Sequence, residues 1–151
     1  MAVRVQAAPF DLSAEIAALT AGRTDAGAVV TFTGMVRGDE AGRGISSLTL
    51  EHYPGMTEAE LARVEAEALA RWPLLASLIV HRTGTLTPGE PIVLVVTVSA
   101  HRAAAFEAAS FLMDFLKTSA PFWKKVAYAD GSSAWVDAKA SDADATARWR
   151  R

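Results

Sequence analysis

The sequence predicts an α+β fold in one domain that spans residues 1–151. Runs rich in β-branched residues alternate with segments of helical periodicity, and two pairs of these runs are joined by turn residues, as in β-hairpins. This order favours a mixed, largely antiparallel sheet with helices packed on it over a doubly wound parallel sheet. With 151 residues, of which 51% are hydrophobic, the chain is long enough for one core but short for two domains.

Three segments have the periodicity and the end signals of helices. Ser13 is expected to cap the first, which ends at Gly22. The second begins at the capping box Thr57-Glu58-Ala59-Glu60 and runs to about Trp72, because Pro73 stops it. The third runs from Ala103 to Lys117. Its apolar stripe is expected to face the core and consists of Phe106, Ala109, Met113 and Leu116.

Strands are expected where β-branched and aromatic residues gather or alternate with polar ones. They are a short strand at Val3 and Val5, then Ala28–Val36, Ile45–His52, Ser77–Thr83, Ile92–Ser99, Phe122–Tyr128 and Ala134–Val136. The fourth and fifth should form a hairpin, and the fifth is nearly all apolar and therefore central. Asp130-Gly131 is a favoured turn between the last two. Residues 37–44, with three glycines, and 140–151, rich in Ala and Asp, are expected to be a mobile loop and a flexible tail.

The composition argues against several classes of function. With 15 basic and 17 acidic residues the net charge is −2, so nothing global attracts nucleic acid or an acidic membrane. No apolar stretch is long enough for a membrane helix or a secretion signal, which predicts a soluble, cytoplasmic protein. The chain has no cysteine and its three histidines lack metal-ligand spacing, so no metal or cofactor is expected. The usual motifs of hydrolases, NTPases and dinucleotide-binding enzymes do not occur.

Candidate binding residues stand at two strand ends. Ser99-Ala100-His101-Arg102 lies where an apolar strand ends and a helix begins, and free N–H groups there suit a phosphate or carboxylate. A capped helix with a solvated arginine would give the same pattern. Arg37 closes a strand and opens the glycine-rich segment, which suits either a binding loop or an exposed turn.

Two lysines are candidates for catalysis. Lys117 stands at the C-terminal end of the third helix, where a cation is also explained by the helix dipole. Lys124 shares a face of its strand with Phe122, Val126 and Tyr128, and apolar surroundings can turn a lysine into an acid, base or nucleophile. The alternative is a lysine that buries its stem and extends its ammonium into solvent.

Five segments, in order, resemble the signature blocks of the molybdopterin synthase large-subunit family. They are Phe32-Thr33-Gly34-Met35-Val36-Arg37, Leu50-Glu51-His52-Tyr53-Pro54-Gly55-Met56, His81-Arg82-Thr83-Gly84, Ser99-Ala100-His101-Arg102-Ala103 and Lys117-Thr118-Ser119-Ala120-Pro121-Phe122-Trp123-Lys124-Lys125. The likeness covers roughly residues 28–139, and five ordered blocks are far more specific than any one of them.

The resemblance implies an α/β hammerhead-type fold with an additional small β subdomain. It also implies a homodimer within a heterotetramer, in which a small ubiquitin-like sulfur-carrier subunit inserts its C-terminal Gly-Gly tail, activated as a thiocarboxylate, into each large subunit. The family converts cyclic pyranopterin monophosphate into molybdopterin, a step of molybdenum cofactor biosynthesis, by two sulfur transfers and opening of the cyclic phosphate. The lack of cysteine agrees with this chemistry, because the sulfur arrives on another chain.

Carried over residue by residue, the family's essential lysines correspond to Lys117 and Lys124. Its substrate contacts correspond to Arg37, His101 and Arg102, and the same blocks add Phe32, Met35, Val36, Lys125 and Val126. Met35 stands where some relatives carry a basic residue, and Val126 replaces a common glutamate that could tune Lys124. Lys139, expected to reach the neighbouring protomer's site, replaces an arginine and loses its bidentate fork.

Two rival functions remain open at this point. The chain could be a non-catalytic docking module that binds a ubiquitin-like tail, or a phosphate-ester hydrolase that uses the same basic cluster. The synthase hypothesis expects Arg37, His101, Arg102, Lys117 and Lys124 to converge on one positively charged cavity in a mildly acidic protein.

Overall fold

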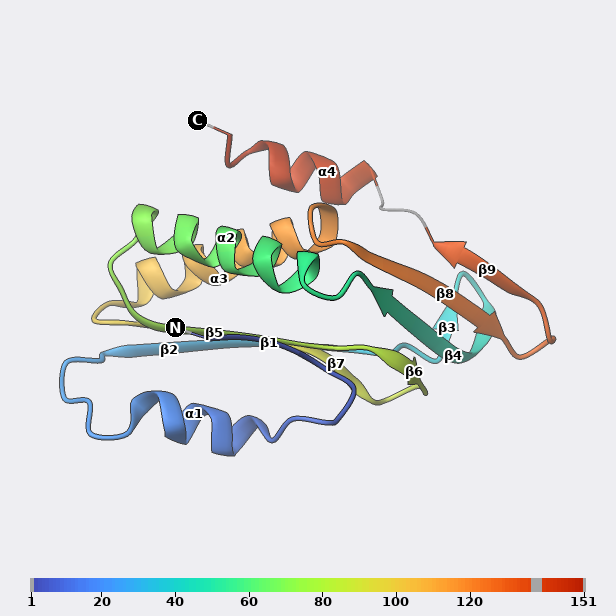
Figure 1. Ribbon diagram of the computed structural model, residues 1–151, viewed down its shortest axis with the longest axis horizontal. Helices are drawn as coiled ribbons and strands as arrows, with labels where there is room; N and C mark the ends of the chain where they lie inside the picture. The colour runs from blue at the N-terminus through green and yellow to red at the C-terminus, as the bar shows by residue number, and fades with distance from the viewer. Residues whose placement is uncertain (1, 137–139, 151) are drawn as a thin grey trace.

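The computed structural model describes residues 2–136 and 140–150, which form two sheets and four helices (Figure 1). The elements in chain order are β1 (Ala2–Gln6), α1 (Leu12–Thr20), β2 (Ala28–Met35), β3 (Asp39–Glu40), β4 (Arg43–His52), α2 (Met56–Arg71), β5 (Leu74–Arg82), β6 (Gly84–Leu86), β7 (Pro91–Ser99), α3 (Arg102–Thr118), β8 (Phe122–Tyr128), β9 (Ser133–Val136) and α4 (Ala140–Ala147). This arrangement confirms the predicted α+β class. No helix of the described residues is long and apolar enough to cross a bilayer.

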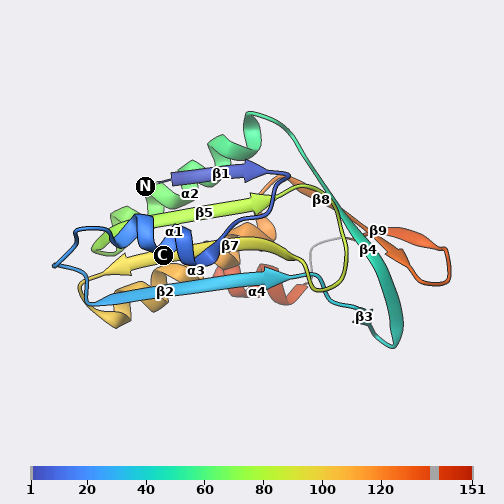
Figure 2. The ribbon, with the colours of Figure 1, turned by 90° about the horizontal axis from the view of Figure 1, so that it is seen from below.

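The first sheet has the strand order β1-β5-β7-β2 (Figure 2). β1 runs parallel to β5, and the other two pairings are antiparallel. The hairpin of β5 and β7 and the central place of β7 were both predicted and are confirmed. Helices α2 and α3 cover one face of this sheet and α1 covers the other, which explains why β7 is apolar on both sides (Figure 1).

The core therefore has two layers, one on each face of the first sheet. On the side of α2 and α3, Ile79 and Val95 pack against Leu61, Phe111 and Leu112. On the side of α1, a second buried cluster is made by Leu78, Val80, Leu94, Val96 and Val98. Neighbouring strand residues thus enter opposite layers, as the period of two requires.

The second sheet extends beyond the end of the first and has the order β3-β4-β8-β9, with β6 paired to β4 (Figures 1 and 2). The predicted hairpin of β8 and β9 is confirmed. In the segment 37–44 the structure forms the hairpin of β3 and β4, whose turn residues Ala41 and Gly42 both have positive φ. Mobility of this segment stays a prediction.

Three details of the helices differ from the sequence prediction. Asp11, not Ser13, caps α1, because its Oδ1 accepts a hydrogen bond of 3.1 Å from the Ala14 N–H. The cap of α2 lies at Gly55, whose N–H donates to Glu58 at 2.6 Å. In the predicted stripe of α3, Phe106 is wrong because it is 61% exposed, whereas Ala109 is buried and Met113 and Leu116 pack against the core.

Helix α4 packs on α3 within the segment expected to be a tail (Figure 1). The buried Thr146 donates to the carbonyl of Asp114 at 2.9 Å. Beyond the helix, the Trp149 ring lies 5.5 Å from that of Trp72 and 5.6 Å from that of Phe111, with the ring planes near perpendicular. Flexibility of this segment stays a prediction.

Candidate active site

A cavity of about 300 Å³ lies where the C-terminal end of α3 meets the second sheet and the end of β2. Its polar wall is formed by Arg37, Glu40, Lys117 and Thr118, with Lys124 beside them. Its remaining lining is apolar and comes from Met35, Val36, Ile45, Leu48, Ile92, Ala120, Phe122, Val126 and Val136. Cations that share a cavity with apolar side chains suit an anionic ligand with an organic body.

Both candidate lysines line this cavity. Lys117 lies in the last turn of α3, where its charge also complements the helix dipole. Lys124 follows from the alternation of β8, in which Phe122, Lys124 and Val126 face the cavity. The sequence prediction that Lys124 keeps apolar company on its strand is confirmed for Phe122 and Val126.

The next lysine of the chain belongs to the other face of β8. Lys125 is exposed and its Nζ lies 5.7 Å from the centre of the Trp135 ring, on the strand paired with it. It does not line the cavity of its own chain.

Arg37 lies at the mouth of the cavity, directly after β2. Its guanidinium is 3.9 Å from the Glu40 carboxylate and its side chain is 65% exposed, so this ion pair constrains it only weakly. The backbone before it is held more firmly, since the Val36 N–H donates to Glu90 at 2.9 Å and the Val36 carbonyl accepts from Gly89 at 2.8 Å.

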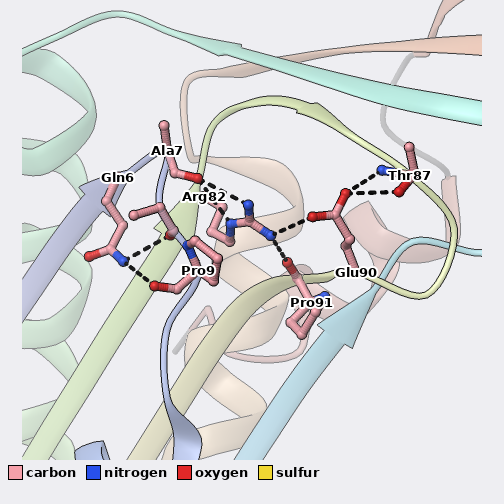
Figure 3. A network of polar contacts seen from close by, with 8 residues as sticks. Gln6, Ala7, Pro9, Arg82, Thr87, Glu90 and Pro91 are labelled. Atoms are coloured by element: carbon pink, nitrogen blue, oxygen red, sulfur yellow. Dashed lines mark hydrogen bonds and ion pairs between the residues drawn. The ribbon is translucent and has the colours of Figure 1, made fainter.

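A buried arginine holds the turn that supports this strand end (Figure 3). Arg82 is 5% exposed, and its guanidinium donates to the carbonyls of Ala7 and Pro91 at 3.1 and 3.0 Å. The Arg82 guanidinium also lies 3.5 Å from one carboxylate oxygen of Glu90. The other carboxylate oxygen of Glu90 accepts hydrogen bonds from the N–H and the hydroxyl of Thr87. The bonds from Thr87 lower the pKa of Glu90, so the turn keeps its negative charge opposite Arg82.

Behind the lysines lies a smaller recess of about 70 Å³. Its lining includes Phe32, Met35, His81, Lys117 and Lys124, so both lysines border the two cavities at once. Phe32 and Met35 are 40% and 54% exposed, which leaves each of them able to contact a bound molecule. The resemblance includes His81 in one of its five blocks, but the sequence indicated no role for it beside the lysines, because β5 and β8 are distant in the chain and belong to different sheets.

His101 and Arg102 lie at the opposite end of α3, about 24 Å along the helix from Lys117. Both side chains are exposed, and neither lines the cavity. Within one chain, therefore, the expected convergence holds for Arg37, Lys117 and Lys124 alone. Lys139 falls outside the described residues.

Comparison with known proteins identifies the family. The family model described as MoaE protein matches residues 5–119, which is most of the chain. The chain belongs to the MoaE protein family. The chain is 60% identical over 149 residues to a protein named molybdopterin synthase catalytic subunit from Mesorhizobium japonicum. The match covers 98% of this chain and 92% of that protein.

Solved structures of MoaE relatives have the same fold. The MoaE protein from Burkholderia ambifaria is 49% identical with a TM-score of 0.83, and the match covers 99% of this chain and 98% of that one. A molybdopterin synthase from Staphylococcus aureus is 32% identical with a TM-score of 0.80, over 88% of this chain and 95% of the other. The MoaE match includes Arg37, His101 and Lys117, whereas Lys124 lies beyond it, in the part that the Burkholderia likeness covers.

Proposed function

We propose that this chain is the catalytic subunit of a molybdopterin synthase. It transfers sulfur from the C-terminal thiocarboxylate of a small ubiquitin-like carrier to cyclic pyranopterin monophosphate, and so forms the dithiolene of molybdopterin. The observation that carries the proposal is the cavity that Lys117, Lys124 and Arg37 share, in a chain of the MoaE family that has no cysteine of its own.

The proposed sulfur transfer gives the two cavity lysines a chemical role. Each transfer forms a carbon–sulfur bond on the pterin side chain and breaks a carbon–oxygen bond at the same carbon. In one transfer the leaving oxygen is that of the cyclic phosphate ester, and in the other it leaves as water. Hydrolysis then breaks the bond between sulfur and the carrier's carbonyl carbon and returns the carrier as a carboxylate. Negative charge develops on oxygen or sulfur in these steps and on the phosphate ester as its ring opens. The ammonium groups of Lys117 and Lys124, which both line the cavity, stabilise that charge or supply protons.

The assembly completes the site. We propose a homodimer, within a heterotetramer with two carriers, in which His101 and Arg102 of one protomer reach the cavity of its partner and bind the substrate phosphate with Arg37. Binding of the phosphate orients the substrate, because it holds the pterin carbons against the carrier tail. Lys139 is proposed to take part in the same contact between protomers. Relatives from bacteria and the lack of a membrane-spanning helix in the described chain support a cytoplasmic location.

Reconstitution tests this function with the purified chain, thiocarboxylated carrier and cyclic pyranopterin monophosphate. Replacing either lysine, as Lys117→Ala or Lys124→Ala, should lower dithiolene formation by at least about 100-fold while carrier binding persists, because a positioned acid or charge stabiliser is lost. Arg63→Ala is the matched control, since Arg63 pairs with Glu60 on the surface of α2.

The same assay separates the rival functions. Carrier binding without any product would support the docking module, and phosphate release without thiocarboxylate would support the hydrolase. Full turnover by either lysine variant would refute the assignment of the site.

A further inference from the structure

His81 is a buried imidazole with defined neighbours on two sides. It is 5% exposed, and its ring stacks on Phe122 with the ring centres 3.8 Å apart and the planes 19° from parallel. Phe122 and Lys124 share a face of β8, so the ring on which His81 stacks lies on the same side of the strand as Lys124. His81 and Lys124 accordingly line the same recess.

The main chain determines which ring nitrogen of His81 carries hydrogen. Nδ1 lies 2.9 Å from the carbonyl oxygen of Arg82, which can only accept, so Nδ1 is the donor. Burial lowers the pKa of His81 to about 4, and the charges of Lys124 and Lys117 act in the same direction. At neutral pH the ring is therefore uncharged, and Nε2 is left as a hydrogen-bond acceptor.

The recess has room for a water molecule as the hydrogen-bond partner of His81 Nε2. Its volume of about 70 Å³ is enough for one or two water molecules, and a buried water needs two or more polar partners. The ammonium groups of Lys117 and Lys124 are donors, whereas His81 Nε2 can only accept in the neutral ring. The other lining groups are apolar side chains or glycine, namely Phe32, Gly34, Met35, Ile92, Val93, Met113 and Leu116.

We propose that His81 is a positioning residue for Lys124: its Nε2 accepts a hydrogen bond, through a water in the recess, that directs the Lys124 ammonium into the cavity. This inference rests on the proposed function for its kinetic readout. A neutral acceptor in the recess also favours the charged form of the Lys124 side chain over the neutral amine.

Variants of His81 test the proposal in the reconstituted assay. His81→Phe keeps the stacked ring but removes the acceptor, so kcat should fall by about 10- to 100-fold with little change in KM for the carrier. The alkaline limb of the kcat profile should move to lower pH, because Lys124 loses its proton more easily. His81→Gln keeps an acceptor oxygen and should recover much of kcat. His52→Phe is the matched control, since His52 also lies near Phe122, at 6.3 Å between ring centres, but lines neither cavity.

The pH dependence of kcat also reflects other titratable groups, which the His81 variants leave in place. Those that line the larger cavity with Lys124 are Lys117 from α3, Arg37 after β2 and Glu40 from β3, whereas His52 from β4 acts on His81. A shift of the alkaline limb seen with His81→Phe but not with His52→Phe therefore reports on the His81 contact.

Three results would overturn the proposal. One is a folded His81→Phe with unchanged kcat and pH profile, and another is an equal loss in His81→Gln and His81→Phe, which would indicate ring packing alone. The third needs no variant: ¹⁵N spectra of the wild-type imidazole must show a protonated Nδ1 and a bare, hydrogen-bonded Nε2 at neutral pH, and the opposite tautomer rules the proposal out. A wild-type chain that makes no product would refute the proposed function, while these spectra would still decide the role of His81.

Discussion

Glu65 is a charged residue that the fold buries away from the site. It is 6% exposed in α2, and its carboxylate accepts a hydrogen bond of 2.6 Å from the Ser77 hydroxyl on β5. Burial raises the pKa of Glu65, so the folded state disfavours its ionised form. A group whose pKa is higher in the folded than in the unfolded protein stabilises the folded state at pH values below its unfolded pKa. That stabilisation is lost as the pH rises through the pKa of the folded state.

Glu65→Gln should therefore stabilise the protein at pH 7, because the amide oxygen can still accept from Ser77 and no buried charge remains. Urea denaturation at several pH values measures the effect. The gain should shrink below the ordinary pKa of a glutamate, where Glu65 is protonated in both states.

Glu60→Gln serves as the comparison for Glu65. The hydrogen bond from Arg63 lowers the pKa of Glu60, so its pH dependence has the opposite sign. A Glu65→Gln variant that is less stable at pH 7, or whose effect does not vary with pH, would contradict the account of Glu65.

At the scale of elements, Gly27 joins β2 to the end of β7. Its N–H donates to the Ser99 carbonyl at 3.0 Å, and a Cβ at this position would lie 2.2 Å from the carbonyl oxygen of Ala100. Because the clashing atom is backbone, Gly27→Ala should destabilise the protein by about 2 kcal/mol or more, measured by denaturant unfolding.

Gly38→Ala provides the contrast for Gly27. A Cβ there would meet Pro88 at 3.7 Å, an ordinary contact, so the change in unfolding free energy should stay within about 0.5 kcal/mol. Equal effects of the two substitutions on the free energy of unfolding would show that the close approach of Gly27 to the Ala100 carbonyl does not determine stability.

The elements that could be predicted were those whose signals are local. The apolar run of β7 and the Asp130-Gly131 turn identified two hairpins, and the period of two placed Lys124 among apolar neighbours. The two-residue β3 and the three-residue β6 have no periodicity to detect, and they form because β4 offers them a partner. The predicted stripe of α3 was wrong only at Phe106, which is apolar but exposed, and it missed Ala105 and Ala108, because buried alanines carry little hydrophobic signal.

The candidate site was predictable in part for a related reason. Side-chain chemistry and order along the chain pointed to Arg37, Lys117 and Lys124, which the fold brings to one cavity. Residue chemistry gave His81 no role, since its proposed role depends on a ring stack between different sheets. The proposed roles of His101 and Arg102, at the other end of α3 from Lys117, depend on contacts beyond one chain, which neither periodicity nor spacing encodes.

At the scale of the whole molecule, the proposed dimer makes each site from two chains. Lys124→Ala and Arg102→Ala should each be nearly inactive alone. When the two variants are co-expressed, half of the dimers pair one variant with the other, and one of the two sites in each such dimer has both native residues. Turnover should then recover to about a quarter of the wild-type value, measured on the mixed population.

A site made within one chain predicts a different result. Every site would then carry one of the two substitutions, and mixing would restore no turnover. Co-expression of Lys124→Ala with Lys117→Ala is the matched control, because both lysines line the cavity of their own chain and no mixed dimer has an intact site.

The contact between Trp149 and Trp72 has an optical consequence. Two indole rings 5.5 Å apart and 87° from parallel form a coupled chromophore pair, and the Trp149 Nε1 anchors it to Asp114 at 2.6 Å. Near-ultraviolet circular dichroism of this pair reports docking of the C-terminal segment, whereas the far-ultraviolet signal reports helices and sheets. Melting followed at both wavelengths therefore distinguishes release of that segment from global unfolding, without an added label.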